Sequence, residues 1–239
     1  MSVNKEVSVI TGSGRGIGYA IAARLAKENH NIVLLSRTES ELKKVKEEID
    51  SFGSDTSYFV GDVADDKFAE TTIEEVQKKY SRIDHLINNA GIGIIKRLVD
   101  SDLDDFKKQI NTNLYGVFNF TKAVLPGMIK RTSGSIINIS SLASKNSFIG
   151  GTMYSASKHA LMGFTKSLML EVREYNIRVV AICPGSVDTR FGSGSKLDPR
   201  SSGRILLPED VAEVVASVIK LPVRALTSEI DLRPTNPKK

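Results

Sequence analysis

The stretch "VSVITGSGRGIGYAIA", from Val7 to Ala22, decides how this chain folds. It begins as an apolar run, passes through a turn with four glycines and ends with helical spacing. The turn does not match G-x-G-x-x-G, and its useful spacing is Gly12-x-x-x-Gly16-x-Gly18. Such glycines let the backbone approach a pyrophosphate at a helix N-terminus, where free N–H groups and the helix dipole favour negative charge. A turn that binds nothing is the plainer alternative, but the density of glycines favours a dinucleotide site. We expect its contacts at Gly12, Ser13, Gly14, Arg15, Gly16, Ile17 and Gly18.

The rest of the chain alternates short apolar runs with longer helical patterns. Strands are predicted at Val7–Thr11, Ile32–Ser36, Ser57–Gly61, His85–Asn88, Ser135–Ser140, Arg178–Cys183 and, more weakly, Glu229–Leu232. Helices are predicted at Ile17–Glu28, Glu39–Phe52, Asp66–Tyr80, Leu103–Lys130, Ser155–Tyr175 and Pro208–Lys220. Continuous apolar strands indicate a sheet that is covered on both faces. The alternation predicts one α/β domain over residues 1–239, a three-layer, doubly wound parallel sheet of the Rossmann type.

Two stretches do not fit this alternation. Ser141–Met153 is a polar loop between a strand and a helix, and Ser186–Leu207 is a longer segment rich in glycine and serine. Both follow the carboxyl end of a strand, where open α/β sheets bind ligands. A loop as long as the second one is usually functional or disordered. We therefore expect a substrate lid at about residues 186–207.

The composition is that of an ordinary globular protein, with 239 residues, 41% hydrophobic and 26% charged. No apolar run reaches the roughly 18 residues that a membrane helix needs, and no apolar secretion segment opens the chain. The net charge of +5 comes from basic residues scattered among acidic ones, which does not favour a nucleic-acid partner. We expect a cytoplasmic protein with no nucleic-acid and no membrane partner.

The cysteine and histidine residues give no sign of a disulfide or a metal centre. Cys183 is the only cysteine and lies in an apolar run, which favours a buried structural thiol. None of His30, His85 and His159 has metal-ligand spacing with another histidine, a cysteine or a carboxylate. The sequence therefore predicts no metal site.

The end of the second strand bears on the choice of nucleotide. NAD sites usually place an acidic residue there, on the ribose diol. This chain has Ser36 and Arg37 instead, and Arg15 lies in the glycine turn. Guanidinium groups make forked, charge-assisted hydrogen bonds to phosphate oxygens. We expect NADP(H) in preference to NAD(H), although Arg37 could also be a solvated residue at a helix start.

Tyr154 and Lys158 stand four residues apart and so share one face of a predicted helix. A free tyrosine has a pKa of about 10, and a nearby ammonium group lowers it. A tyrosine tuned in this way can give a proton to a carbonyl oxygen as hydride arrives. Alone, such a pair is more often an ordinary helix start, and the dinucleotide turn changes that balance.

Several motifs, in order along the chain, resemble those of the short-chain dehydrogenase/reductase family. They are "TGSGRGIG" (Thr11–Gly18), "GDV" (Gly61–Val63), "NNAG" (Asn88–Gly91), "NTNLYG" (Asn111–Gly116) with "IINISS" (Ile136–Ser141), "YSASK" (Tyr154–Lys158) and "PGSVDT" (Pro184–Thr189). The similarity covers at least Val7 to Pro184. Each motif is weak alone, and the ordered set is a strong signal. The resemblance implies an NADP-dependent enzyme that interconverts a carbonyl and an alcohol.

The resemblance also implies roles for individual residues. Catalysis would fall to Asn113, Ser141, Tyr154 and Lys158, with Asn111 and Ser140 as rivals of the first two. Tyr154 would be the proton donor and Lys158 its tuning charge and a ribose ligand. Ser141 would bind the substrate oxygen, and Asn113 a water that connects Lys158 to solvent. Further cofactor contacts would come from Asp62, Val63, Asn89, Ala90, Gly91, Pro184, Gly185, Val187 and Thr189.

The substrate is less clear from the sequence. The resemblance extends to 3-oxoacyl-[acyl-carrier-protein] reductases, our first expectation, and to family members that act on pterin side-chain ketones or on short 3-hydroxy acids. The tail "LTSEIDLRPTNPKK" lacks the glycines of many relatives and favours the latter two groups. The lid charges could attract an acidic carrier protein or an anionic substrate, although solvated side chains are the plainer interpretation (Arg190, Lys196, Arg200, Arg204). A non-catalytic NADP-binding scaffold is the alternative of another class. By analogy, we expect a homodimer or homotetramer paired through the helices near Leu103–Lys130 and Ser155–Tyr175.

Overall fold

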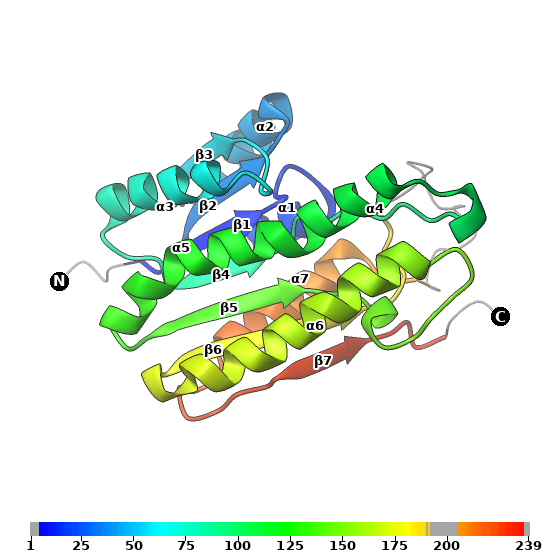
Figure 1. The fold of residues 1–239 in the computed structure, drawn as a ribbon. Helices are drawn as coiled ribbons and strands as arrows, with labels where there is room; N and C mark the ends of the chain where they lie inside the picture. The colour runs from blue at the N-terminus through cyan, green and yellow to red at the C-terminus, as the bar shows by residue number, and fades with distance from the viewer. Residues whose placement is uncertain (1–4, 190, 192–204, 237–239) are drawn as a thin grey trace.

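The computed structural model describes residues 5–189, 191 and 205–236, and they form one parallel sheet covered by helices on both faces (Figure 1). The strand order is β3-β2-β1-β4-β5-β6-β7, and all pairings are parallel. The strands are β1 (Val7–Thr11), β2 (Asn31–Ser36), β3 (Thr56–Val60), β4 (His85–Asn88), β5 (Gly134–Ile139), β6 (Ile177–Pro184) and β7 (Glu229–Leu232). The predicted three-layer, doubly wound sheet is confirmed.

Helices from both halves of the chain cover the two faces of this sheet (Figure 1). The helices are α1 (Gly16–Ala26), α2 (Glu39–Asp50), α3 (Asp66–Tyr80), α4 (Leu103–Ile110), α5 (Gly116–Lys130), α6 (Thr152–Val172) and α7 (Pro208–Ile219). Short 3-10 turns lie at Leu98–Asp100, Leu142–Ser144 and Arg173–Tyr175. Among the described residues, no helix has both the length and the apolar character that crossing a bilayer requires.

The core is divided by the sheet into two apolar layers, which explains why the strands read as continuous apolar runs. Ile10 faces one layer together with side chains of α1, α2 and α7. Its neighbour Val9 faces the other layer, with side chains of α3, α5 and α6. Successive side chains of a strand alternate between faces, so both sets must be apolar here.

The predicted helix Leu103–Lys130 is wrong in one respect, because it is interrupted. A π-helical turn, η2 (Asn111–Tyr115), separates α4 from α5. Such turns are rare and are often found at functional sites. The helix that carries Tyr154 also starts earlier than predicted, at Thr152 rather than Ser155. Ser140 and Ser141 lie just beyond β5, which ends at Ile139.

Candidate active site

The glycine turn between β1 and α1 is held against the segment that follows β4. The Asn89 side-chain amide donates hydrogen bonds to the carbonyls of Thr11, at 2.9 Å, and Gly12, at 3.1 Å. Gly12 has a φ of +66°, and a Cβ there would lie 2.8 Å from the Ala90 Cα. A Cβ on Gly18 would lie 2.3 Å from the Gly12 carbonyl oxygen. The turn therefore needs glycine for its backbone conformation and for its close packing.

The predicted nucleotide contacts of this turn divide into two groups. The Ser13 side chain is fully buried and accepts a hydrogen bond from the Leu35 backbone N–H at 2.8 Å, so it braces the turn. Ile17 packs against the core. The backbone from Gly14 to Gly16 leads directly into the first turn of α1, where unpaired N–H groups attract a phosphate.

The end of β2 brings together the charged residues on which we based the nucleotide preference. Arg15 forms an ion pair with Glu41 at 3.2 Å, and Arg37 forms one with Asp62 at 3.5 Å. Both guanidinium groups are well exposed, with side-chain exposures of 63% and 66%. Ser36 lies beside the turn, since its Oγ would be 3.1 Å from a Cβ on Gly14. This corner presents two exposed cations, each balanced by one carboxylate.

The π-turn η2 presents Asn113 to the interior next to Lys158. The Asn113 side chain accepts a hydrogen bond from the Ile92 N–H at 2.9 Å and donates to Ser157 Oγ at 3.0 Å. Its Oδ1 and the Lys158 Nζ flank Gly91, at 3.3 and 3.7 Å from the position of an added Cβ. The structure thus brings Gly91, Asn113 and Lys158 together. Asn111, the rival candidate, lies at the start of the π-turn.

Lys158 is buried, with an exposure of 4%, and its ammonium group donates to the Ile139 carbonyl at 3.0 Å. It forms no ion pair with a carboxylate in the described part of the chain. Burial without a counter-charge disfavours the ammonium form and lowers the pKa of Lys158 to about 8. The ammonium form of Lys158 is therefore less favoured than that of an exposed lysine.

Tyr154 lies one helical turn before Lys158 on α6, and Lys158 Nζ is 5.9 Å from the centre of its ring. Burial raises the pKa of Tyr154, and a side-chain hydrogen bond with Ser141 opposes that shift. The expected lowering by Lys158 is therefore not the dominant effect on this pKa. Ser141 Oγ also accepts a hydrogen bond from the Ala143 N–H at 3.1 Å, which fixes its position at the start of the 3-10 turn.

The segment after β6 returns toward the glycine turn. The Gly185 N–H donates to the Leu232 carbonyl at 2.8 Å, which holds the end of β6 against β7. Thr189 faces the turn, because its Cγ2 would lie 3.3 Å from a Cβ on Gly16. Val187 forms a parallel bridge with Leu206, so the two ends of the lid are tied together. Most of the predicted lid, residue 190 and residues 192–204, lies outside the described residues, as do its four basic side chains.

Two features of the site were missed in the sequence. The Phe191 ring packs edge-on against Tyr154, with ring centres 5.8 Å apart. Asn138 on β5 accepts a hydrogen bond from Asn88 at 2.9 Å and donates to Thr165 on α6 at 2.8 Å. These two hydrogen bonds between buried side chains hold α6 against the sheet. "NNAG" was the only signal for the brace, and no pattern pointed to Phe191.

Comparison with known proteins agrees with this geometry. The family model described as short chain dehydrogenase matches residues 6–199. The chain is 34% identical to a sepiapterin reductase of Chlorobaculum tepidum, with 97% of each chain covered. It is 35% identical to a 3-oxoacyl-[acyl-carrier-protein] reductase of Thermotoga maritima, with 90% of each covered. It is also similar to the solved alcohol dehydrogenase of Thermococcus sibiricus complexed with 5-hydroxy-NADP, with a TM-score of 0.92 and 30% identity, covering 98% of this chain and 99% of that one.

The nucleotides in solved structures of this fold differ. Some of these proteins hold NADP and one holds NAD+, so the fold alone does not determine the nucleotide. The three that hold these nucleotides are named as an oxidoreductase or a dehydrogenase. With a family model that spans most of the sequence and relatives that match nearly end to end, this chain belongs to the short chain dehydrogenase family and is a pyridine-nucleotide-dependent oxidoreductase.

Proposed function

We propose that this chain is an NADPH-dependent carbonyl reductase that interconverts a ketone and a secondary alcohol. One observation carries the proposal: Ser141, Tyr154 and Lys158 gather beside Gly91 and Asn113, at the carboxyl edge of the sheet. The glycine turn lies at the same edge, as the order of β1, β4 and β5 requires. A carbonyl between them would lie against both a proton donor and a nucleotide.

In this proposal the four residues divide the work of one proton transfer. Bound NADPH supplies the hydride. The Tyr154 hydroxyl donates the proton to the carbonyl oxygen, and Ser141 donates a second hydrogen bond that holds that oxygen. The Lys158 ammonium would favour the phenolate that remains. In the structure, the side-chain hydrogen bond with Ser141 opposes the burial that raises the pKa of Tyr154. Asn113, next to Lys158, would position the water from which the proton is replaced.

The first experiment follows NADPH absorbance with a panel of carbonyls: 3-oxoacyl thioesters, pterin ketones, 3-keto acids and sugars. We place 3-oxoacyl thioesters first and sepiapterin-like ketones or 3-hydroxy acids second. The relative named as a 3-oxoacyl-[acyl-carrier-protein] reductase supports the first choice, and the one named as a sepiapterin reductase supports sepiapterin-like ketones. Turnover of any class supports a reductase. Tight NADPH binding without turnover of any substrate would instead favour a non-catalytic NADP-binding scaffold.

The carrier-protein part of the proposal needs its own comparison. The same 3-oxoacyl group should be offered on an acidic carrier protein and on a small thioester. A higher kcat/KM for the carrier-bound form, reduced by added salt, would support recognition of the carrier's charge. Equal kcat/KM values for the two forms would mean that the enzyme recognises the 3-oxoacyl thioester and not the carrier protein.

The proposed preference for NADP rests on Arg15 and Arg37, whose guanidinium groups are exposed at the corner where we expect the 2′-phosphate. We expect Arg37→Asp to remove most of the preference for NADP over NAD. The change replaces a guanidinium group that can donate two hydrogen bonds to the 2′-phosphate with a carboxylate that repels it. Arg173→Asp makes the same charge change at an exposed position beyond α6 and should leave the preference unchanged. Equal affinity of the unmodified protein for the two nucleotides would refute this part of the proposal.

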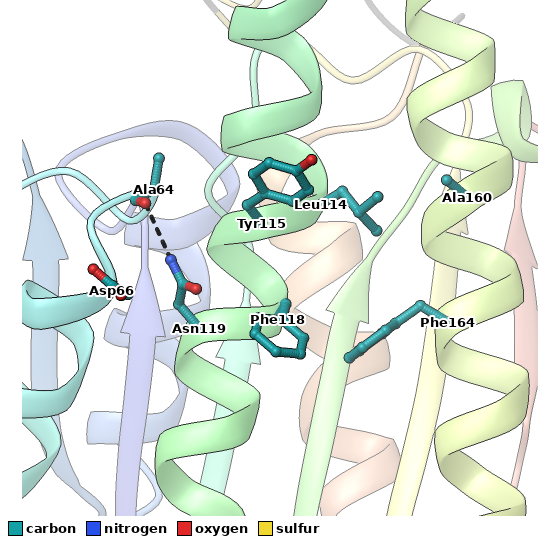
Figure 2. A pocket seen from close by; sticks show the side chains of 8 residues that line it. All are labelled: Ala64, Asp66, Leu114, Tyr115, Phe118, Asn119, Ala160 and Phe164. Atoms are coloured by element: carbon teal, nitrogen blue, oxygen red, sulfur yellow. Dashed lines mark hydrogen bonds between the residues drawn. The ribbon is translucent and has the colours of Figure 1, made fainter.

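We also propose that the protein is a homo-oligomer paired through α5 and α6. A groove of about 600 Å³ runs between these helices, and Phe118 and Phe164 line it from opposite sides (Figure 2). Phe118 and Tyr115 are half exposed beside this groove, and a contiguous exposed apolar surface often marks a protein–protein contact. Light scattering should give a dimer or tetramer, and Phe118→Glu should shift it toward the monomer. A monomeric mass for the unmodified protein would contradict the proposal.

A further inference from the structure

Three residues that are far apart in the sequence converge at the amino edge of the sheet, opposite the candidate active site. Glu6 immediately precedes β1, His30 immediately precedes β2, and His85 opens β4. These strands are neighbours, because β1 lies between β2 and β4. The register pairs Val7 with Asn31 and Ser8 with His85, so the three side chains emerge on one face of the sheet. One possible ligand atom from each residue lies within 4.8 Å of the others.

We propose that Glu6, His30 and His85 form a zinc site. The Glu6 Oε2 is 3.5 Å from His30 Nε2 and 3.3 Å from His85 Nε2. A tetrahedral zinc ion with nitrogen and oxygen ligands at roughly 2.0–2.2 Å separates its ligand atoms by about 3.3–3.5 Å. Two edges of the ligand triangle therefore already have the length that zinc requires. Two imidazoles with one carboxylate are a donor set that zinc accepts.

The outer hydrogen bonds of the histidines suit this role. His30 Nδ1 lies 2.9 Å from Ser8 Oγ, and with Nδ1 as the donor the Nε2 lone pair is left for a metal. His85 Nδ1 and Ser135 Oγ are both buried and lack a hydrogen-bond partner among the described residues. His85 and Ser135 are paired in register on β4 and β5. A hydrogen bond from His85 Nδ1–H to Ser135 would satisfy both. In the zinc-bound form, Nε2 would give up the proton of its present hydrogen bond with Glu6, and its lone pair would bind the ion.

The surroundings leave one coordination position open to solvent. His30 and His85 are buried, with exposures of 6% and 4%, whereas the Glu6 side chain is 50% exposed. A fourth ligand can therefore be a water molecule that enters beside Glu6. The ion would connect the amino ends of three adjacent strands, far from Tyr154, and so it would act on stability and not on hydride transfer.

The test is zinc binding by the full chain prepared without a histidine tag and dialysed against a chelator. Calorimetric titration with zinc chloride should show one ion per chain, and cobalt chloride should give the visible absorption of tetrahedral cobalt. Glu6→Gln should weaken binding by at least about tenfold, since even outer hydrogen-bond partners contribute 10- to 100-fold. His30→Gln should weaken it further, and the melting temperature should rise with zinc only in proteins that bind it.

Two matched variants separate this site from surface binding. His159→Gln removes the one other histidine of the chain, and Glu75→Gln removes an exposed carboxylate on α3, so both should bind zinc as the unmodified protein does. Circular dichroism shows whether each variant is folded. If His30→Gln is not folded, the test still stands on Glu6→Gln, which changes a half-exposed position. Absence of saturable binding by the unmodified protein, or binding that is unchanged in Glu6→Gln, would overturn the proposal.

Discussion

Two buried charged side chains, one at each edge of the central sheet, have different partners. At the carboxyl edge, the buried Lys158 ammonium has one backbone carbonyl and no carboxylate among the described residues, and burial lowers the pKa of Lys158 to about 8. At the amino edge, the buried Asp84 carboxylate is fully occupied, because it pairs with Arg82 and accepts a hydrogen bond from the Val7 N–H at 2.9 Å. From this difference we expect Lys158 to take part in the proposed proton transfer and Asp84 to hold the strands together.

The largest expected effect tests the reactive side of this comparison. Tyr154→Phe removes the proposed proton donor, and turnover of a substrate found in the panel should fall by about 10²–10⁴-fold. NADPH affinity and the free energy of unfolding should change little, because the ring stays in place. Tyr175→Phe, beyond the other end of α6, is the matched control and should retain activity. Comparable rates for Tyr154→Phe and the unmodified protein would refute Tyr154 as the proton donor, and with it the difference in role between the two edges.

The structural side of the comparison is tested by Asp84→Ala. This change leaves the buried Val7 N–H and the Arg82 guanidinium without their acceptor, at a cost of about 1–3 kcal/mol in the free energy of unfolding. Urea denaturation measures that loss, and kcat at a temperature where the variant is folded should stay the same. A large fall in kcat with unchanged stability would mean that the amino edge takes part in the chemistry.

The lack of a carboxylate partner for Lys158 among the described residues can be tested through pH. The pKa of Lys158 is lowered from 10.5 to about 8 in the folded chain, so between these values the unfolded chain binds more protons than the folded one. Stability attributable to this group therefore rises as the pH increases from about 8 to about 10.5. In urea denaturation, the unfolding free energy of the unmodified protein should therefore rise over that range relative to the unfolding free energy of Lys158→Met. If this relative unfolding free energy does not change with pH, another group must balance the charge of the Lys158 ammonium.

The smallest expected effect concerns the ring that covers Tyr154. Phe191→Ala removes an edge-on aromatic contact 5.8 Å from ring centre to ring centre. Such contacts contribute modestly, so we expect KM to rise by about three- to tenfold with kcat nearly unchanged. Phe52→Ala, which removes a half-exposed ring at the end of α2, is the control. A fall in kcat as large as that of Tyr154→Phe would instead assign Phe191 to positioning the proton donor.

The fold was predictable from the sequence because hydrophobic periodicity marks each strand and helix, and because strand–helix alternation allows few topologies. The interruption at η2 was not, since Asn111–Tyr115 has the same helical spacing as its flanks. The extra residue of that turn accompanies the hydrogen bonds of Asn113 to Ile92 and Ser157, which form only after folding.

The grouping of side chains was predictable to different degrees at the two edges. At the carboxyl edge, the ends of parallel strands meet by topology, so Ser141 and the glycine turn could be placed together in advance. At the amino edge, the approach of Glu6, His30 and His85 depends on which residues of β2, β1 and β4 lie opposite one another. Sequence spacing contains no information on that register.

The hydrogen bonds from Asn89 to the backbone of the glycine turn have a thermodynamic consequence. They order the turn when the chain folds, so little conformational entropy is left to lose when a nucleotide arrives. We therefore expect the proposed nucleotide site to be ordered in the folded state and its affinity to be linked to the stability of the whole sheet. In a variant whose turn is loosened, added nucleotide would act as a folding ligand and recover part of the lost stability.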